Sequence, residues 1–370
     1  MKVSIDGVGV RVLLRAGTIV HELPPIWLRE RSPEPGEIDA RTGQRLFNPH
    51  LFPADLRIDV ALQTGDTLSV RFSDGHVAEF DCNELRRQIT ALNLLPSRSM
   101  WRSDLNPLPY YPMSRLNTSK GHSGALSDLM KYGFVVVTGI EQSPTALLGV
   151  ADYFGVSRDH PRGLLNNVEE DSRWLKPVAR SVVPHTVDPF RTPVPGFQIV
   201  YCSAQDTSVS TSTIVDGLSV VDRLRREAPD AVRLLAEVNV TFRYRDERGD
   251  HLAVRPILDT DVNGLVRSIH YNPMLDELPL MSAAVTQRFH VARHRFAELI
   301  GHPDFSLSFP LRAGHAIVVD NARVLHGHDP AAQDTGIQVC RLEIDGPSSK
   351  FRALSRSTRS ERRVSSGLNR

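Results

Sequence analysis

Residues 184–202 read PHTVDPFRTPVPGFQIVYC, and residues 320–329 read DNARVLHGHD. In both stretches, histidine and aspartate stand at the edge of an apolar run rich in β-branched residues, which is typical of the end of a buried strand. The first stretch holds His185 and Asp188, and the second holds His326 and His328. Two such strand ends, far apart in the chain, predict a strand-rich fold that brings polar side chains to one site.

Strands and helices mix in the sequence around these two stretches. Strand-like patterns dominate from residue 182 onward, and helical periodicity interrupts them at residues 220–238 and 283–301. Upstream, the pattern predicts a helix near residues 123–131, a strand in GFVVVTGI at residues 133–140, and a helix in LLGVADYFG at residues 147–155. This mixture indicates an α+β fold.

The first quarter of the chain has a different pattern. Short alternating stretches such as VGVRVLL and LSVRF, separated by Gly-Asp, Asp-Gly and proline-rich turns, predict a small β-rich N-terminal domain at residues 1–94. Residues 95–118, rich in proline, serine and aromatic residues, predict an ordered connector to the main domain at residues 119–355. Residues 356–370 form a polar, basic tail.

The composition excludes several classes of protein. The chain has 370 residues, 44 of them basic and 43 acidic, so it lacks the charge excess typical of proteins that bind nucleic acid or a membrane surface. No apolar run reaches the length of a membrane span, and the N-terminus does not resemble a signal peptide. Three scattered cysteines fit a reducing compartment, so we expect a cytoplasmic protein.

The histidine clusters match the needs of a mononuclear iron(II) site. Such a site uses two imidazoles and one carboxylate on one face of the metal, leaving positions for a 2-oxo acid and dioxygen. A single histidine at a strand end is more often a surface or core residue than a ligand. The sequence has no motif for serine hydrolase, phosphate-loop, zinc-protease or dinucleotide-binding chemistry that would compete with this interpretation.

Several ordered blocks resemble the γ-butyrobetaine and trimethyllysine dioxygenase family, within the taurine dioxygenase group. Residues 24–49 and 72–85 resemble its N-terminal domain, and the blocks YGFVVVTGI, PHTVDPFRTPVPGFQIVYC, STSTIVDGL, FRYRDERGD, IHYNP and DNARVLHGHD resemble its catalytic domain. The resemblance implies a double-stranded β-helix, or jelly roll, with flanking helices. It also implies an oxidoreductase that uses Fe(II) and 2-oxoglutarate.

The resemblance further implies roles for individual residues. His185 and His326 match the iron ligands, Arg341 matches the cation that grips the far carboxylate of 2-oxoglutarate, and Ser212 matches a second contact to it. Asn272 stands where a polar group faces the substrate, and His328 is a reserve ligand more simply explained as a solvated residue. Cys340 competes with Arg341 for the cosubstrate position, depending on the alignment chosen.

The metal motif departs from the family pattern of histidine, any residue, aspartate. Val187 occupies the carboxylate position, and Asp188 follows it. Strict alternation would turn Asp188 away from the metal, whereas a bulge, favoured by Pro189, could bring it back. Halogenating relatives have a small residue at this position, but valine would fill the space that chloride needs. Two possibilities stay open: Asp188 is the third ligand, or the site has only two histidines.

The N-terminal domain departs from its relatives as well. The family's structural zinc is held by three cysteines and one histidine, but only His76 is retained here, so we expect no structural zinc and an exposed turn position for His76. Residues 159–168 lack the aromatic residues expected to cage a quaternary ammonium group, which disfavours carnitine-pathway substrates.

Three functional hypotheses follow. The first is a 2-oxoglutarate-dependent iron oxygenase that hydroxylates or otherwise oxidises a small molecule. The second is a catalytically silent relative that acts as a binding protein, and the third is an iron oxygenase independent of 2-oxoglutarate. Relatives with a similar N-terminal domain suggest a homodimer.

Overall fold

The computed structural model describes residues 2–6, 9–16, 18–39, 41–91, 95–143, 145–155, 165–167, 183–203, 210–246, 249–328, 337–342, 346–352 and 354. The chain divides into two compact units, Met1–Leu94 and Leu95–Arg370. Within the described part of the chain, no helix has the length and apolar character needed to cross a membrane.

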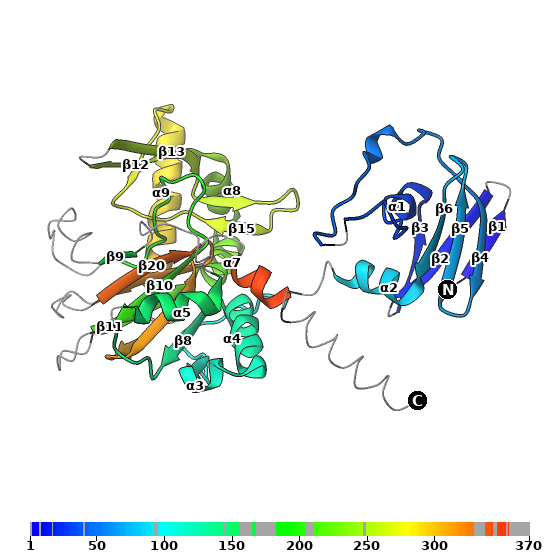
Figure 1. Cartoon of the computed structure of the whole chain (residues 1–370). Helices are drawn as coiled ribbons and strands as arrows, with labels where there is room; N and C mark the ends of the chain where they lie inside the picture. Colours follow the sequence, from blue (N-terminus) through cyan, green and yellow to red (C-terminus); the bar gives the residue numbers. More distant parts are fainter. Residues whose placement is uncertain are drawn as a thin grey trace. The chain divides into compact units, whose positions relative to one another are not determined.

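The first unit is built from two three-stranded antiparallel sheets (Figure 1). One contains β1 (Lys2–Asp6), β2 (Gly9–Ala16) and β3 (Ile19–Leu23), and the other contains β4 (Ile58–Thr64), β5 (Thr67–Phe72) and β6 (Val77–Asp81). Alternation along β5 buries Leu68, Val70 and Phe72 in the core that the two sheets share. The helical elements are α1 (Pro25–Arg29), the 3-10 turn η1 (Pro49–Leu51) and α2 (Cys82–Ala91).

A buried arginine organises the loop after α1. The Arg29 guanidinium donates to both carboxylate oxygens of Glu37, at 2.7 and 3.3 Å, and to Asp74 at 3.0 Å. Its Cζ also lies 4.5 Å from the centre of the Phe52 ring. Because this fork joins residues from three segments, it stabilises the loop with charge-assisted hydrogen bonds.

His76 belongs to the same network, and its predicted exposure is wrong. The His76 side chain is 17% exposed, and its Nε2 lies 2.9 Å from the hydroxyl of Ser32, which is fully buried. The prediction failed because it considered only the turn around His76 and not Ser32, which lies 44 residues earlier in the chain.

The second unit contains a six-stranded sheet in the order β7-β8-β18-β10-β20-β9, which we call the major sheet (Figure 1). β7 pairs parallel to β8, and the other pairs are antiparallel. The strands are β7 (Tyr110–Pro112), β8 (Phe134–Thr138), β18 (His315–Asp320), β10 (Phe197–Cys202), β20 (Ile337–Leu342) and β9 (Leu165–Asn167).

A three-stranded sheet, the minor sheet, packs on the major one. It has the order β17-β11-β19, formed by β17 (Ser306–Leu311), β11 (Ser210–Asp216) and β19 (Val324–His328). Ile214 and Phe309 of the minor sheet share one apolar cluster with Val136 and Ile317 of the major sheet. The chain passes from β10 to β11 and from β17 through β18 and β19 to β20, changing sheet at each of these steps. This is the winding of a jelly roll, within a mixed α+β unit.

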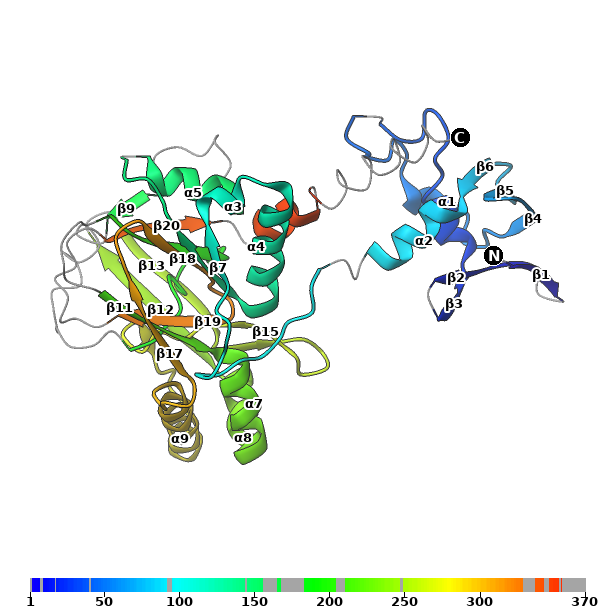
Figure 2. The same ribbon diagram turned by 90° about the horizontal axis from the view of Figure 1, so that it is seen from below.

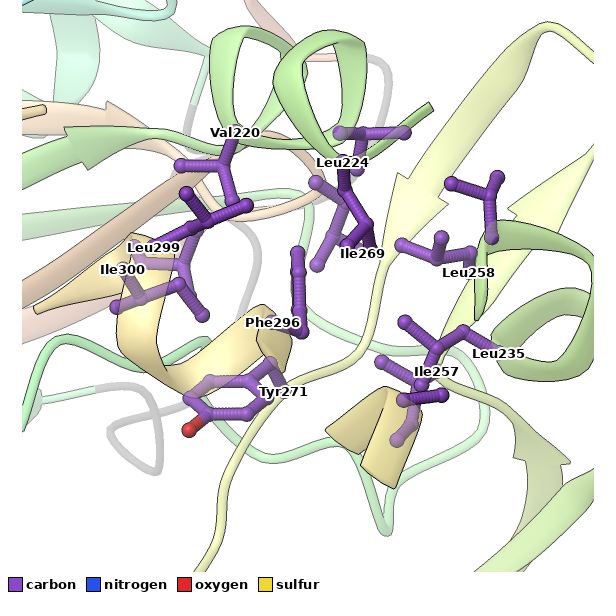
Figure 3. Packing of buried hydrophobic residues seen from close by; sticks show 14 of the residues in the cluster. Val220, Leu224, Leu235, Ile257, Leu258, Ile269, Tyr271, Phe296, Leu299 and Ile300 are labelled. Atoms are coloured by element: carbon purple, nitrogen blue, oxygen red, sulfur yellow. The ribbon is translucent and has the colours of Figure 1, made fainter. Parts of the chain in front are cut away.

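Helices cover both outer faces of the two sheets (Figure 2). α3 (Met113–Leu116), α4 (Ser119–Tyr132) and α5 (Ala146–Phe154) pack on the major sheet through a cluster that includes Ile199 and Val318. α7 (Gly217–Glu227), α8 (Pro229–Glu237) and α9 (Ala283–Ile300) pack on the minor sheet. Figure 3 shows this second cluster, in which Phe296 of α9 lies among Leu224, Ile269 and Tyr271.

Two small sheets complete the unit. β12 (Asn239–Asp246) forms a hairpin with β13 (Gly249–Pro256) and also pairs with β16 (Asp276–Glu277), while β14 (Leu258–Thr260) pairs with β15 (Val266–Ile269). The hairpin follows from the RDERGD stretch, in which charged and glycine residues separate two alternating runs. These strands lead the chain from α8 to Tyr271, which lies at the candidate site.

The connector is fastened to the jelly roll by a buried ion pair. Arg323 and Asp216 are both fully buried, and Arg323 Nε donates to Asp216 at 2.9 Å. The same guanidinium donates to the carbonyl of Ser99, and Asp216 accepts from the backbone N–H of Trp101 at 3.0 Å. The contacts to Ser99 and Trp101 therefore fix the connector ahead of β7.

Candidate iron site

His185 and His326 lie side by side in the second unit. They form an isolated antiparallel bridge in which each backbone N–H donates to the other residue's carbonyl, at 3.1 and 3.0 Å. Their ring centroids are 5.4 Å apart, and the ring planes differ by 30°. Two imidazoles from stretches more than a hundred residues apart therefore meet, as the strand-end pattern predicts.

The chemistry of these rings fits a bound metal ion. The Nδ1 of His185 lies 3.0 Å from the Val183 carbonyl, which can only accept, so Nδ1 carries the proton and the lone pair is on Nε2. A backbone carbonyl that orients a histidine in this way is a common partner of metal-binding imidazoles. Metal–imidazole bonds are about 2 Å long, so one ion between the rings could bind a nitrogen of each.

The segment after His185 is held by two distant residues. Thr186 donates its N–H to the Tyr271 carbonyl at 2.7 Å, and its hydroxyl accepts from the Tyr271 N–H at 2.9 Å. The N–H of Val187 donates to the Asn321 side chain at 2.7 Å, and that side chain donates back to the Val187 carbonyl at 3.0 Å. The side-chain amide of Asn321 therefore fixes both the N–H and the carbonyl of Val187.

Tyr271 transmits this anchoring to the hydrophobic core. Its ring meets Phe296 of α9 edge-on, with centroids 5.4 Å apart, and Figure 3 shows both side chains within the buried cluster. Burial raises the pKa of the Tyr271 phenol to about 12, so the ring is uncharged near neutral pH. The position of Thr186 is thus set by the packing of α9 against the jelly roll.

Asp188 sits in a turn and not in a regular strand. Its φ is 49°, in the left-handed region that few residues other than glycine adopt. Its carbonyl accepts from the Arg191 N–H at 3.0 Å, and its carboxylate accepts from Arg191 Nε at 2.9 Å. The irregular backbone that the sequence allows here is present, but the structure pairs the Asp188 carboxylate with arginine.

The described residues contain no group of three histidine, cysteine or acidic side chains arranged to hold a metal ion. The two imidazoles therefore fit an iron site, while the third protein donor of the family pattern is not found among those residues. The ligand assignments of His185, His326 and Asp188 stay predictions.

The cosubstrate candidates occupy neighbouring strands. Ser212 lies in β11 and is 8% exposed, and its register partner in β19 is His328. Arg341 pairs in register with Gln198 of β10, whereas Cys340 pairs with Ile199, which belongs to the outer cluster under the helices. The register therefore sets Arg341 and Cys340 opposite residues on the two different faces of β10.

Asn272 follows Tyr271 directly in the chain. Its side-chain oxygen accepts from the Met274 N–H at 3.2 Å, and its carbonyl accepts from the Leu275 N–H at 3.1 Å. In this state Asn272 caps a turn, beside the residue that anchors Thr186. Residues 159–164 and 168, the greater part of the stretch examined for caging aromatics, lie outside the described residues.

Sequence reasoning missed two polar residues at this site. Asn321, the second residue of the DNARVLHGHD stretch, fixes Val187, and Gln198 interrupts the apolar run GFQIVYC. Gln198 is 5% exposed, and its side-chain oxygen has no hydrogen-bond partner among the described residues. A polar residue inside an apolar strand was the available signal, because a buried amide without a partner is costly and needs an explanation.

Comparison with known proteins places the chain in a family. Residues 112–342 match the model of the taurine catabolism dioxygenase TauD, TfdA family. The chain belongs to the TauD/TfdA dioxygenase family. A γ-butyrobetaine dioxygenase of Pseudomonas sp. (strain AK-1) is 30% identical over 349 residues, which cover 90% of each chain. This confirms the resemblance read from the sequence blocks.

Other relatives of this TauD-family chain are more distant. A trimethyllysine dioxygenase of Gallus gallus is 23% identical over 87% of this chain and 80% of its own. A solved taurine dioxygenase structure from Burkholderia xenovorans matches 66% of this chain and 90% of its own, with 12% identity and a TM-score of 0.48. The family assignment makes the protein an oxidoreductase dependent on Fe(II) and 2-oxoglutarate, as predicted.

Proposed function

We propose that this dioxygenase oxidises a small organic molecule on an Fe(II) ion bound by His185 and His326. The observation that carries the proposal is the meeting of these two imidazoles, with centroids 5.4 Å apart and their backbones hydrogen-bonded to each other. The third protein ligand is either Asp188 or absent, as the sequence leaves open.

The remaining roles concern binding. Arg341 would hold the far carboxylate of 2-oxoglutarate, because a guanidinium fork pairs bidentately with a carboxylate, and the Ser212 hydroxyl would donate to the same group. Support comes from the burial of Ser212 and from the register that places Arg341 beside Gln198. Asn272 would contact the substrate. Bound iron would supply the dioxygen chemistry that amino-acid side chains lack.

The substrate class that we propose excludes the kind of substrate for which the relatives are named. Relatives are named for γ-butyrobetaine and trimethyllysine. Residues 159–168 contain no phenylalanine, tyrosine or tryptophan, so we propose a small molecule without a quaternary ammonium group. We also propose that Met1–Leu94 is an N-terminal domain of the γ-butyrobetaine dioxygenase type without structural zinc, and that the protein is a cytoplasmic homodimer.

Anaerobic titration of the full chain with Fe(II) and 2-oxoglutarate tests the function. We expect the weak visible charge-transfer band of the iron chelate in the unmodified protein and its loss in His185→Ala and His326→Ala. His294→Ala is the matched control, because His294 is 68% exposed on α9 and pairs with Glu298 there, so the band should persist.

Two results would contradict the proposal. A flat spectrum in the unmodified protein would favour a relative that binds ligands without oxidising them. Oxygen uptake equal with and without 2-oxoglutarate would favour an iron oxygenase that does not use this acid.

A further inference from the structure

The stretch Val187–Asp188 decides how many protein ligands the iron has. Val187 occupies the position of the family's carboxylate, and its side chain cannot coordinate a metal. Val187 is 7% exposed, and Asn321 holds both its N–H and its carbonyl. Since this amide fixes the backbone, Asp188 cannot shift into the place of Val187 without breaking two buried hydrogen bonds.

The Asp188 carboxylate already has a cationic partner. It accepts from Arg191 Nε at 2.9 Å, and the Asp188 side chain is only 11% exposed. The backbone contact from the Arg191 N–H to the Asp188 carbonyl closes the same turn. Two contacts between the same residues, one of them charge-assisted, make Asp188 part of the turn's own structure.

Residues of the β12–β13 hairpin also contact the turn that joins Asp188 to Arg191. Arg255 of β13 donates to the Arg191 carbonyl at 2.8 Å and to the Thr192 hydroxyl at 3.0 Å. Phe190, inside the turn, stacks on Tyr244 of β12 with centroids 5.0 Å apart and planes 17° apart. The β12–β13 hairpin therefore holds the loop in the shape that joins Asp188 to Arg191.

We propose that Asp188 is a structural residue and that His185 and His326 are the only ligands among the described residues, the third position being filled by a small anion from solution. This rests on the proposed function, namely that the two histidines bind iron. The absence of a third metal-binding side chain beside them, among the residues that the structure describes, agrees with the proposal. Two neutral imidazoles leave the charge of the ion uncompensated, which favours an anion such as chloride or a simple carboxylate.

Cobalt(II) binding to the full chain, followed by its visible absorption, tests this without any turnover. The matched pair is Asp188→Asn and Arg191→Met, because both break the same ion pair but only the first removes a carboxylate. We expect both to bind Co(II) within about threefold of the unmodified protein, while His185→Ala and His326→Ala weaken binding at least tenfold. Thermal unfolding of each variant verifies that it is folded.

A second arm tests the open position. Acetate or chloride should change the Co(II) spectrum of the unmodified protein and of Asp188→Asn. Val187→Asp, which places a carboxylate in the family position, should tighten Co(II) binding and remove the effect of added anions.

The outcomes separate the two proposals. If Asp188→Asn weakens Co(II) binding as much as the histidine variants while Arg191→Met does not, Asp188 is a ligand and the inference is overturned. A spectrum unaffected by anions would likewise overturn it, because the third position would then not take an anion from solution. If the histidine variants bind Co(II) normally, the proposed function fails instead.

Discussion

At the scale of single residues, the polar groups within the jelly roll differ in whether they have partners. Arg323 and Asp216 are fully buried, yet their charged atoms meet each other and the connector backbone. Gln198 and Tyr201, on opposite faces of β10, are also buried, but within the part of the chain that the structure describes the Gln198 side-chain oxygen and the Tyr201 hydroxyl have no hydrogen-bond partner. A satisfied network stabilises a fold, whereas an unpaired group costs about 1–3 kcal/mol.

Replacing these unpaired groups should therefore stabilise the ligand-free protein. We expect Gln198→Leu and Tyr201→Phe each to raise the free energy of unfolding by about 1 kcal/mol, measured by urea denaturation. Gln198 pairs in register with Arg341, whereas Tyr201 packs in the outer cluster under α5. Only Gln198→Leu should weaken 2-oxoglutarate binding. Equal binding by both variants would mean that Gln198 has no part in the site.

At the scale of elements, the spacing of apolar residues correctly predicted those helices and strands that local sequence determines. The strands around Phe134–Thr138 and the helix at Ala283–Ile300 follow from apolar runs and helical spacing. The helical stretch at residues 220–238 is two helices, because Pro229 cannot continue the first one and begins the second. These outcomes depend on residues that are neighbours in the sequence.

The candidate site depends on distant residues, and this limited its prediction. The sequence pointed to His185 and His326 as candidate ligands because histidines at the ends of two apolar strands suggest a metal site whatever the backbone between them does. The shape of residues 186–188 was not predicted, since it is set by Tyr271, 85 residues away, and by Asn321, 134 residues away. No single-sequence pattern encodes hydrogen bonds between such separated side chains, so the sequence left both a regular strand and a bulge open at this point.

The end of α4 offers a test at this scale. Gly133 caps the helix with φ 81°, and a Cβ there would lie 2.7 Å from Val324 Cγ2 in the buried cluster. We expect Gly133→Ala to lower the free energy of unfolding by about 1–3 kcal/mol, from backbone strain and overpacking. Gly149, inside α5, has open space around it, so Gly149→Ala should instead add about 0.5–1 kcal/mol. Destabilisation by both would contradict this distinction.

At the scale of the whole molecule, charge is nearly balanced, with 44 basic and 43 acidic residues. The pH dependence of stability therefore depends on individual buried groups and not on net repulsion. Burial raises the pKa of Asp320 and of Asp276, so each folded carboxyl keeps its proton to a higher pH than in the unfolded chain. Their stabilising contribution is present below the ordinary value of 3.8 and is lost as pH rises through the folded pKa.

His270 has the opposite effect on stability. Burial lowers its pKa from the ordinary 6.5, and Arg255 acts in the same direction, while the Pro256 carbonyl and Asp259 oppose the shift. The ring donates from Nδ1 to that carbonyl at 3.1 Å and lies 3.3 Å from the Ser268 hydroxyl through Nε2, which suits the neutral form. Below pH 6.5 the unfolded chain takes up a proton that the folded protein excludes, so stability falls as pH falls.

Glutamine at this position can keep both hydrogen bonds without titrating, so His270→Gln isolates the effect. Between pH 8 and pH 5.5, we expect the unmodified protein to lose up to about 1.4 kcal/mol of unfolding free energy relative to the variant, since one pH unit corresponds to at most that amount. Asp320 and Asp276 titrate alike in both proteins and cancel in the difference. Urea unfolding curves of the two proteins at several pH values would measure it, and a difference that stays constant with pH would show that His270 is protonated as readily in the fold as outside it.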